Sequence, residues 1–192
     1  MQTHFTETQL KDPQMQRTND ILRSCIHCGF CTATCPTYQV LGDELDSPRG
    51  RIYLIKDMLE NHRVPDEKTV KHVDRCLSCL ACMSTCPSGV NYMHLVDHAR
   101  AYIEETYQRS WSDRLLRWTL ARILPYPNRF RLALLGARIM RPFRHLMPDR
   151  RLKAMLEMAP RQIPVRSLND DAQTFPAQGS QKMRVALMTG CA

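Results

Sequence analysis

Apolar residues recur at helical spacing in the stretch that follows residue 47. Ser47 and Pro48 favour a helix start, because serine caps helix ends and proline suits the first helical position. Apolar residues then recur every three or four positions, at Ile52, Ile55 and Leu59, and form one face of a helix. The pattern predicts a helix that begins at Pro48 and ends near Asn61.

Further helices are predicted along the rest of the chain. A short one begins near Pro65 and carries a small apolar stripe of Val70 and Val73. After a turn at residues 88–91, a longer helix presents an amphipathic face made of Tyr92, Leu95, Val96, Ala99, Tyr102 and Ile103. Residues 109–158 are also expected to be helical, with breaks at Pro125, Pro127, Pro142 and Pro148.

The composition divides the chain into five parts. Residues 1–18 are polar and are predicted to form a loosely docked arm. Residues 19–103 contain an internal repeat, in which a cysteine loop followed by a helix occurs two times. A basic helical extension is expected at 104–158 and a linker rich in Pro, Gln, Asn, Asp and Ser at 159–182. In 183–192, apolar residues predict a strand with no partner on which to pack, so we expect the front part of a longer protein.

Eight of the nine cysteines lie in two matching loops. Residues 25–36 have the sequence CIHCGFCTATCP, and residues 76–87 have the sequence CLSCLACMSTCP. A short helical turn around residues 20–23 is expected to lead into the first loop. Gaps of two residues let three thiolates surround one iron–sulfur cluster, and Gly29 suits the tight turn that this requires. The repeat predicts two 4Fe–4S clusters.

The fourth cysteine of each loop comes three residues after the third and precedes a proline. In two-cluster ferredoxins, such a cysteine ligates the other cluster. This pattern assigns the first cluster to Cys25, Cys28, Cys31 and Cys86. It assigns the second cluster to Cys76, Cys79, Cys82 and Cys35. The predicted fold is therefore mainly α, a bacterial-type two-cluster, alpha-helical ferredoxin-like module with a helical extension, in which cluster binding and folding are coupled.

Zinc and disulfides are the alternatives to iron–sulfur clusters. The N-terminus has neither the basic nor the apolar region of a signal peptide, and a cytoplasmic compartment keeps thiols reduced. Structural zinc usually takes paired C-x2-C knuckles separated by a longer loop. The alternative to an electron-transfer function is a protein-interaction module that is stabilised by zinc or by a cluster.

The histidines and the common catalytic motifs give no site for substrate chemistry. His27 is interpreted as an exposed or hydrogen-bonded side chain that tunes a cluster, because eight cysteines already fill eight ligand positions. His94 and His98 stand four residues apart, a spacing that is more often a solvated helix face than a metal site. The sequence has no glycine-rich phosphate loop, nucleophile elbow or zincin motif. We therefore expect no catalytic residue in this chain.

The basic character is concentrated in one segment. The formal net charge is +8, whereas residues 109–153 hold 12 Lys and Arg against 2 Asp and Glu, a net of +10. Three interpretations stay open: a helical extension that packs on the ferredoxin-like module, a surface that docks to anionic membrane lipid, or an interface for an acidic flavin subunit. Nucleic-acid binding is not expected, because no recognition motif accompanies the charge.

Two quoted stretches resemble the N-terminal region of the iron–sulfur subunit of bacterial glycolate oxidase, a glycolate dehydrogenase. They are CIHCGFCTATCPTYQVLGDELDSPRGRIYLIKDMLE and DRCLSCLACMSTCPSGVNY. The resemblance is weaker in RPFRHLMP and returns at RVALMTGCA, so that it covers residues 19–192 and is most specific at 23–92. More distant relatives are the equivalent subunits of anaerobic glycerol-3-phosphate dehydrogenase, lactate-oxidation complexes and heterodisulfide reductases, which remain alternatives.

The resemblance implies an electron-relay subunit. Flavin-containing partner subunits would oxidise glycolate to glyoxylate, with FAD only in those partners, and the two clusters would pass single electrons toward a quinone or another acceptor. It implies a cytoplasmic protein, peripheral on the inner face of the membrane in one interpretation. Cys191 is interpreted either as a family cysteine that opens a further cysteine-rich domain or as a small residue at a strand end.

Overall fold

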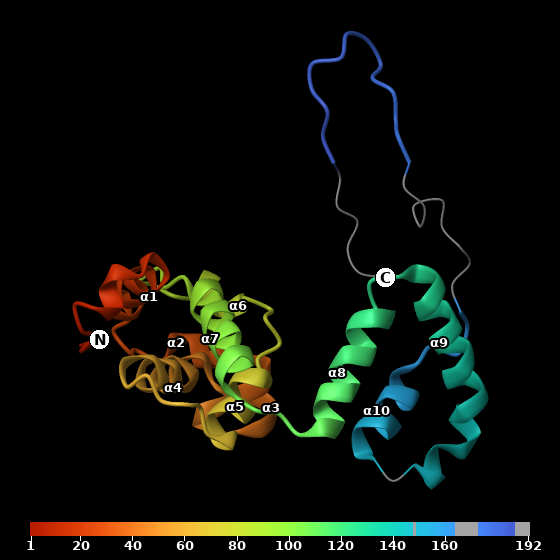
Figure 1. Ribbon diagram of the computed structural model, residues 1–192, viewed down its shortest axis with the longest axis horizontal. Coiled ribbons are helices and arrows are strands. Elements are labelled where there is room, and N and C mark those ends of the chain that lie inside the picture. The colour runs from red at the N-terminus through yellow and green to blue at the C-terminus, as the bar shows by residue number, and fades with distance from the viewer. Residues whose placement is uncertain (148, 164–172, 187–192) are drawn as a thin grey trace. The chain divides into compact units, whose positions relative to one another are not determined.

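The computed structural model describes residues 1–147, 149–163 and 173–186. All secondary-structure elements in these ranges are helices. No strand occurs within these ranges, so the prediction of a mainly α fold is confirmed. The chain divides into two units, Met1–Gln108 and a second one that begins at Arg109 (Figure 1). Each unit is described by itself.

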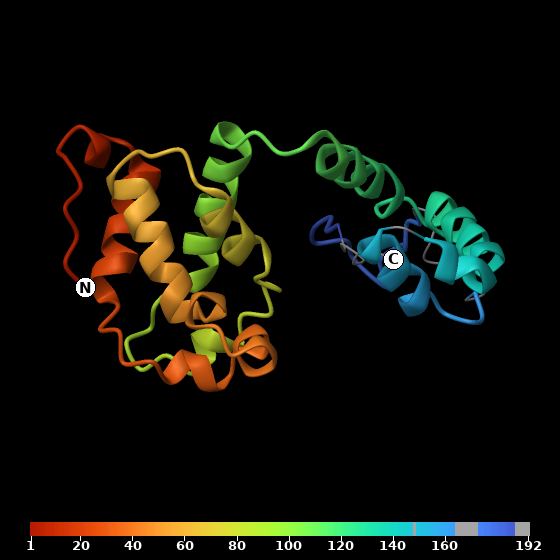
Figure 2. The same ribbon diagram turned by 90° about the horizontal axis from the view of Figure 1, so that it is seen from below.

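The first unit holds all eight cysteines of the two loops. Its elements are η1 (Gln9–Lys11), α1 (Pro13–Ser24), α2 (Phe30–Ala33), α3 (Pro36–Leu41), η2 (Glu44–Asp46), α4 (Pro48–Glu60), α5 (Glu67–Asp74), α6 (Ala81–Ser84) and α7 (Tyr92–Thr106). Helix α7 contacts α1, α4 and α5 (Figure 1, Figure 2). The short helices α2 and α6, which belong to the two cysteine loops, contact each other.

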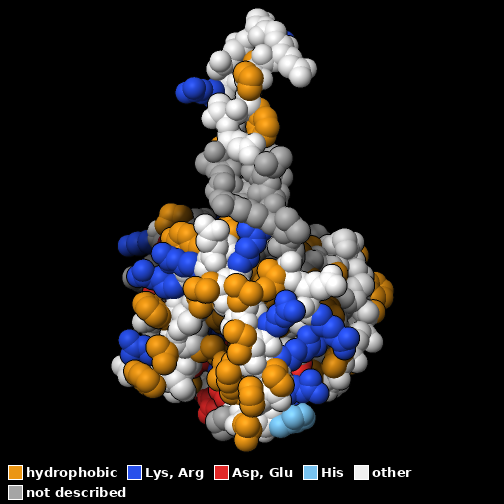
Figure 3. Space-filling view, turned by 90° about the vertical axis from the view of Figure 1, so that its right-hand side faces the viewer, with side chains coloured by type: hydrophobic (Ala, Val, Ile, Leu, Met, Phe, Trp, Pro, Cys, Tyr) orange, Lys and Arg blue, Asp and Glu red, His pale blue; other side chains and the backbone are white. Residues whose placement is uncertain are grey.

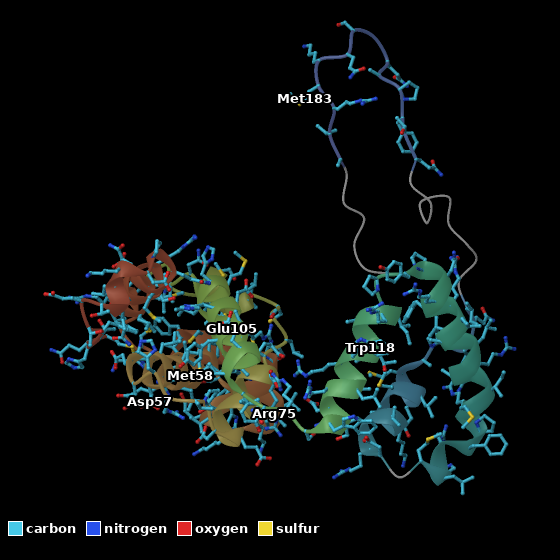
Figure 4. All side chains as sticks on the ribbon, in the orientation of Figure 1. Asp57, Met58, Arg75, Glu105, Trp118 and Met183 are labelled. Carbon is cyan, nitrogen blue, oxygen red and sulfur yellow. The ribbon has the colours of Figure 1, made fainter. Side chains whose placement is uncertain are left out.

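The core of the first unit lies between α4 and α7. Its buried apolar residues on α4 are Ile52, Ile55, Met58 and Leu59, and those on α7 are Leu95, Val96, Ala99 and Ile103. Figure 4 labels Met58 beside Asp57, its half-buried neighbour on α4, which forms an ion pair with Arg63. Burial of this apolar face is the main favourable contribution to the fold of the unit.

The predicted helix boundaries agree with the structure. The Ser47 side chain accepts a hydrogen bond from the Gly50 backbone N–H, Pro48 occupies the first helical position, and α4 ends at Glu60. Asp66 caps α5 in the same way through the Thr69 N–H. Helix α7 carries the apolar face predicted from residue 92 onward.

The N-terminal segment differs from the loosely docked arm expected over residues 1–18. Helix α1 begins at Pro13, capped by Asp12, and is much longer than the turn predicted around residues 20–23. Met15 is buried in the core, and the Gln9 side chain donates hydrogen bonds of 3.1 Å to the carbonyl oxygens of Leu59 and Glu60. These contacts fix the segment to the end of α4.

The second unit contains α8 (Trp111–Ile123), α9 (Pro127–Met140), η3 (Arg141–Leu146) and α10 (Arg150–Met158). The predicted breaks at Pro125, Pro127 and Pro142 fall between or at the start of these elements, and Pro148 lies outside the described residues. An ion pair of 2.8 Å between Arg151 and Asp113 joins α10 to α8. None of the helices described is long and apolar enough to cross a membrane.

The C-terminal predictions are only partly within the described residues. The described parts of the predicted linker 159–182 have neither helix nor strand. The strand predicted at 183–188 is absent from residues 183–186, and the remainder lies outside the described residues, as does Cys191.

Candidate iron–sulfur site

The two cysteine loops follow the same unusual backbone path. His27 and Ser78, at equivalent positions, have φ of 56° and 52°, and Gly29 and Leu80 have φ of 86° and 58°. A side-chain-bearing residue in this left-handed region costs about 1–2 kcal/mol, and such strain concentrates at functional sites. Alternating left-handed residues bend each loop so that α2 begins directly after Gly29 and α6 directly after Leu80.

The first loop opens onto a cavity with about 440 Å³ of empty space, which includes space open to solvent. We call this the first cavity. The cysteines that line it are Cys25, Cys28, Cys31, Cys82 and Cys86. Cys86 belongs to the second loop, so both loops contribute thiols to this cavity.

The second loop opens onto a cavity with about 300 Å³ of empty space, the second cavity. Its cysteines are Cys35, Cys76, Cys79 and Cys82. Cys35 comes from the first loop, and Cys82 lines both cavities. Each cavity therefore gathers thiols from residues about fifty positions apart in the sequence.

The thiols have the chemistry of a soft-metal site. All eight are free, and none of them forms a disulfide. Burial, and then the neighbouring thiols of Cys31, Cys76, Cys35 and Cys79, raise the pKa of Cys82 to about 12. Burial likewise raises the pKa of Cys31. These thiols lose their protons when positive metal ions bind, and two cavities with at least four thiols each fit two iron–sulfur clusters.

Helix α7 holds the second loop in place. The Tyr92 hydroxyl, which lines both cavities, donates a hydrogen bond of 3.8 Å to the Cys76 sulfur, and burial raises the pKa of Tyr92 well above its ordinary value. Arg100 donates bonds of 2.6 Å to the Cys76 carbonyl oxygen and 2.7 Å to the Ser78 hydroxyl. These bonds from α7 hold the backbone of the second loop in a fixed orientation.

The first turn of α4 lies between the two cavities. Arg49 lines the first cavity, whereas Pro48 and Arg51 line the second. Gly50 separates the two arginines and packs against η2, where a Cβ atom would come within 2.1 Å of the Glu44 carbonyl oxygen. Only glycine fits this contact, because the obstacle is backbone and cannot move aside.

We expect Gly50→Ala to destabilise the first unit by several times the cost of an ordinary surface substitution, because overpacking typically costs about 1–3 kcal/mol. Denaturation followed by circular dichroism measures the change. Gly136→Ala on α9 is the matched control, since nothing lies within 4 Å of its Cβ position and alanine favours helix by about 1 kcal/mol. Equal stability of the two variants would contradict the packing argument.

His27 lies on the first cavity, whereas His94 and His98 face helix α1. His27 lines the first cavity, and its buried Nε2 has no hydrogen-bond partner among the described residues. His98 is buried, with its Nδ1 2.6 Å from the Thr18 hydroxyl, while His94 contacts Arg17. The expectation that His94 and His98 form a solvated face is therefore wrong, because both meet α1, which packs on this side of α7.

Sequence reasoning missed a buried ionic group next to the second cavity. Asp46 on η2 accepts hydrogen bonds from His72, at 2.9 Å, and from Arg75, at 2.8 Å. Burial raises the pKa of Asp46, but these donors outweigh it and hold the pKa below its ordinary value. Arg51 completes the group at 3.4 Å. Arg51, in the sequence SPRGR at residues 47–51, was the available indication.

Comparisons with known proteins support this chemistry. Residues 21–90 match the model of a family described as a 4Fe–4S dicluster domain. The whole chain is 43% identical over 192 residues to the glycolate oxidase iron–sulfur subunit of Escherichia coli (strain K12) and covers 44% of that protein. Over 88% of the chain, it is 34% identical to the probable glycolate oxidase iron–sulfur subunit of Bacillus subtilis (strain 168), of which it covers 41%.

A more distant similarity reaches another class of iron–sulfur subunit. Over 43% of the chain, it is 28% identical to the succinate dehydrogenase iron–sulfur subunit of Coxiella burnetii, of which it covers 37%. No solved structure matches the chain. The chain spans less than half the length of the two glycolate oxidase subunits. The resemblance inferred from the cysteine loops is confirmed: the chain is similar over most or all of its length to glycolate oxidase iron–sulfur subunits, and its residues 21–90 match a 4Fe–4S dicluster domain.

Proposed function

We propose that the chain is the electron-transfer part of a glycolate oxidase complex, with its clusters bound by crossed sets of cysteines. The observation that carries the proposal is the composition of the two cavities. The first cluster takes Cys25, Cys28, Cys31 and Cys86. The second takes Cys76, Cys79, Cys82 and Cys35. Cys82 lines both cavities and is given to the second, where Cys76 and Cys79 of its own C-x2-C-x2-C run also lie.

The residues around the cavities hold and shield the clusters. A bound 4Fe–4S cluster accepts and releases one electron at a time. Tyr92 and Arg100 fix the second loop, and α2 packs against α6 so that the two cavities are neighbours that share Cys82. Cys28 and Cys79 are exposed, which brings one edge of each site to the surface where a partner protein can approach.

Substrate oxidation is proposed to occur in partner subunits. A flavin accepts two electrons from glycolate together, whereas an iron–sulfur relay carries them singly, so the two functions suit separate subunits. In this arrangement the partners bind FAD and oxidise glycolate, and a quinone or another acceptor receives the electrons. This chain would be cytoplasmic and would not oxidise substrate alone.

Anaerobic co-purification followed by glycolate-dependent dye reduction tests the function. The chain alone should reduce no dye, while addition of the co-purified flavoprotein should give glycolate-dependent reduction of the clusters. Turnover of glycolate by the chain alone would refute the relay. A partner specific for lactate or glycerol 3-phosphate would replace glycolate with that substrate, and a chain that binds zinc and no iron would favour an interaction module.

The basic helices are proposed to dock to an anionic membrane surface. Trp111, Leu115 and Trp118 follow helical spacing on α8 and are exposed, the two tryptophans by 76% and 59%. Figure 3 shows hydrophobic side chains mixed with Lys and Arg on one face of this unit, and Figure 4 labels Trp118. Apolar side chains that enter the lipid interface among cations fit a peripheral helix, and the net charge of +10 is complementary to anionic lipid.

We expect the chain to sediment with vesicles that contain phosphatidylserine, and to be released by about 0.5 M salt because ions screen the attraction. Trp118→Ala should weaken this binding several-fold. The matched control is Tyr53→Ala on α4, which removes an exposed aromatic residue from the first unit. Equal loss in both variants, or stronger salt-dependent binding to DNA or to the acidic flavin subunit, would contradict the membrane proposal.

A further inference from the structure

The two arginines of α4 occupy opposite environments. Residues two apart on a helix lie on different faces, so Arg49 and Arg51 face different cavities. Arg49 pairs with Glu44 at 2.7 Å, and both side chains are more than a third exposed. Arg51 is 1% exposed and is among the largest fully buried side chains described. The first cavity thus faces a solvent-screened cation and the second a buried one.

Every nitrogen of the Arg51 guanidinium has a fixed contact. Its Nε donates to the His72 carbonyl oxygen at 2.6 Å, and Nη1 and Nη2 both donate to the Thr37 hydroxyl at 3.1 Å. Nη1 also lies 3.9 Å from the Cys35 sulfur. The Thr37 hydroxyl lies 3.1 Å from the same sulfur. The positive charge is therefore held rigidly beside a proposed ligand of the second cluster.

The counter-charge does not cancel this cation fully. Asp46 is the buried carboxylate paired with Arg51, but it also binds Arg75 at 2.8 Å and His72 at 2.9 Å. Asp43, 3.9 Å from His72, is about half exposed and screened by solvent. Asp46 is thus shared between Arg51 and Arg75, so its negative charge offsets that of the buried Arg51 guanidinium only in part.

We propose that Arg51 raises the reduction potential of the second cluster and thereby directs electrons from the first cavity toward the second. Reduction adds one electron and breaks no bond; dithionite or the flavin partner supplies that electron. A nearby cation stabilises the added negative charge, and this attraction is stronger in a buried site than in water. Charge and hydrogen bonds near the sulfurs are established determinants of cluster potential. The inference rests on the two-cluster assignment in the proposed function.

Redox titration of the chain with dithionite, monitored by EPR, tests the proposal. Arg51→Gln removes the charge and keeps a hydrogen-bonding side chain, and should lower the midpoint potential of the second cluster by about 59 mV or more, a tenfold shift in a one-electron equilibrium. Arg51→Lys should restore most of the difference. Arg49→Gln, the matched control, should move the first midpoint by less than half as much because its site is screened.

An opposite change of charge separates electrostatics from structural damage. Asp46→Asn removes the buried negative charge and should raise the second midpoint, whereas general loosening of the site would move both variants in the same direction. If Arg51→Gln does not fold, Arg75→Gln decides the question. Arg75 binds the buried Asp46 at 2.8 Å, so its loss leaves more of that negative charge beside the second cavity and should lower the second midpoint with little change in the first.

Equal shifts at both clusters, or a second midpoint that moves by less than half the expected amount, would overturn the role of Arg51. The titration needs no glycolate, so it distinguishes this proposal from the proposed function. Failure of the glycolate assay would refute the proposed substrate and would leave the role of Arg51 standing. Unchanged midpoint potentials in the variants would refute the role of Arg51 and would leave the proposed function standing.

Discussion

Cys35→Ser should abolish the EPR signal of the cluster built on the second loop and leave the other signal in place. Cys35 belongs to the first loop but lines the second cavity, and a serine oxygen is a poor substitute for a soft thiolate. Cys86→Ser should have the reverse effect, because Cys86 lines the first cavity. Since each cluster ties both loops together, either variant should also give less folded protein.

Reference spectra come from variants of cysteines that ligate the cluster of their own loop. Cys25→Ser removes a ligand of the first cluster, and Cys76→Ser removes a ligand of the second, without crossing between loops. If Cys35→Ser and Cys25→Ser removed the same signal, each loop would hold its own cluster. The crossed arrangement of ligands would then be wrong.

Asp46→Ala should be among the most destabilising single substitutions in the first unit. It leaves Arg51 buried with no carboxylate partner, and breaking a buried pair from one side costs about 3–5 kcal/mol. That cost is a large share of the roughly 5–15 kcal/mol that stabilises a typical domain. Urea denaturation of the cluster-loaded protein, performed anaerobically, measures the difference.

Glu44→Ala is the matched control for this prediction. Glu44 lies on η2 like Asp46 and also pairs with an arginine of α4, but its pair is exposed and is expected to contribute only about 0–1 kcal/mol. Comparable destabilisation by the two variants would mean that burial of the Asp46–Arg51 pair does not determine its importance.

The local parts of the fold could be predicted because their causes are local. Ser47 and Pro48 are adjacent in sequence to the helix they start, and the apolar face from Tyr92 onward is visible as a periodicity. The same reasoning applies to Asp12 and Pro13, which start α1 with an equivalent cap. That helix was missed because the polar composition of the first eighteen residues concealed the few apolar side chains that it buries.

The contacts around the site could not be predicted in the same way. Asp46 and His72 are 26 residues apart, and Thr18 and His98 are 80 apart, so their pairing depends on how the helices pack. Leu80 takes the left-handed conformation that Gly29 takes in the first loop, although its side chain disfavours it. Only the repeat of the cysteine spacing indicated that the two loops share one backbone path.

The count of iron and acid-labile sulfide per chain, in anaerobically prepared protein, tests the central claim most directly. Two 4Fe–4S clusters predict about eight irons and about eight sulfides for each chain, with low-temperature EPR of the reduced protein showing two cubane centres. About four irons per chain, a 2Fe–2S spectrum, or zinc in place of iron would contradict the account.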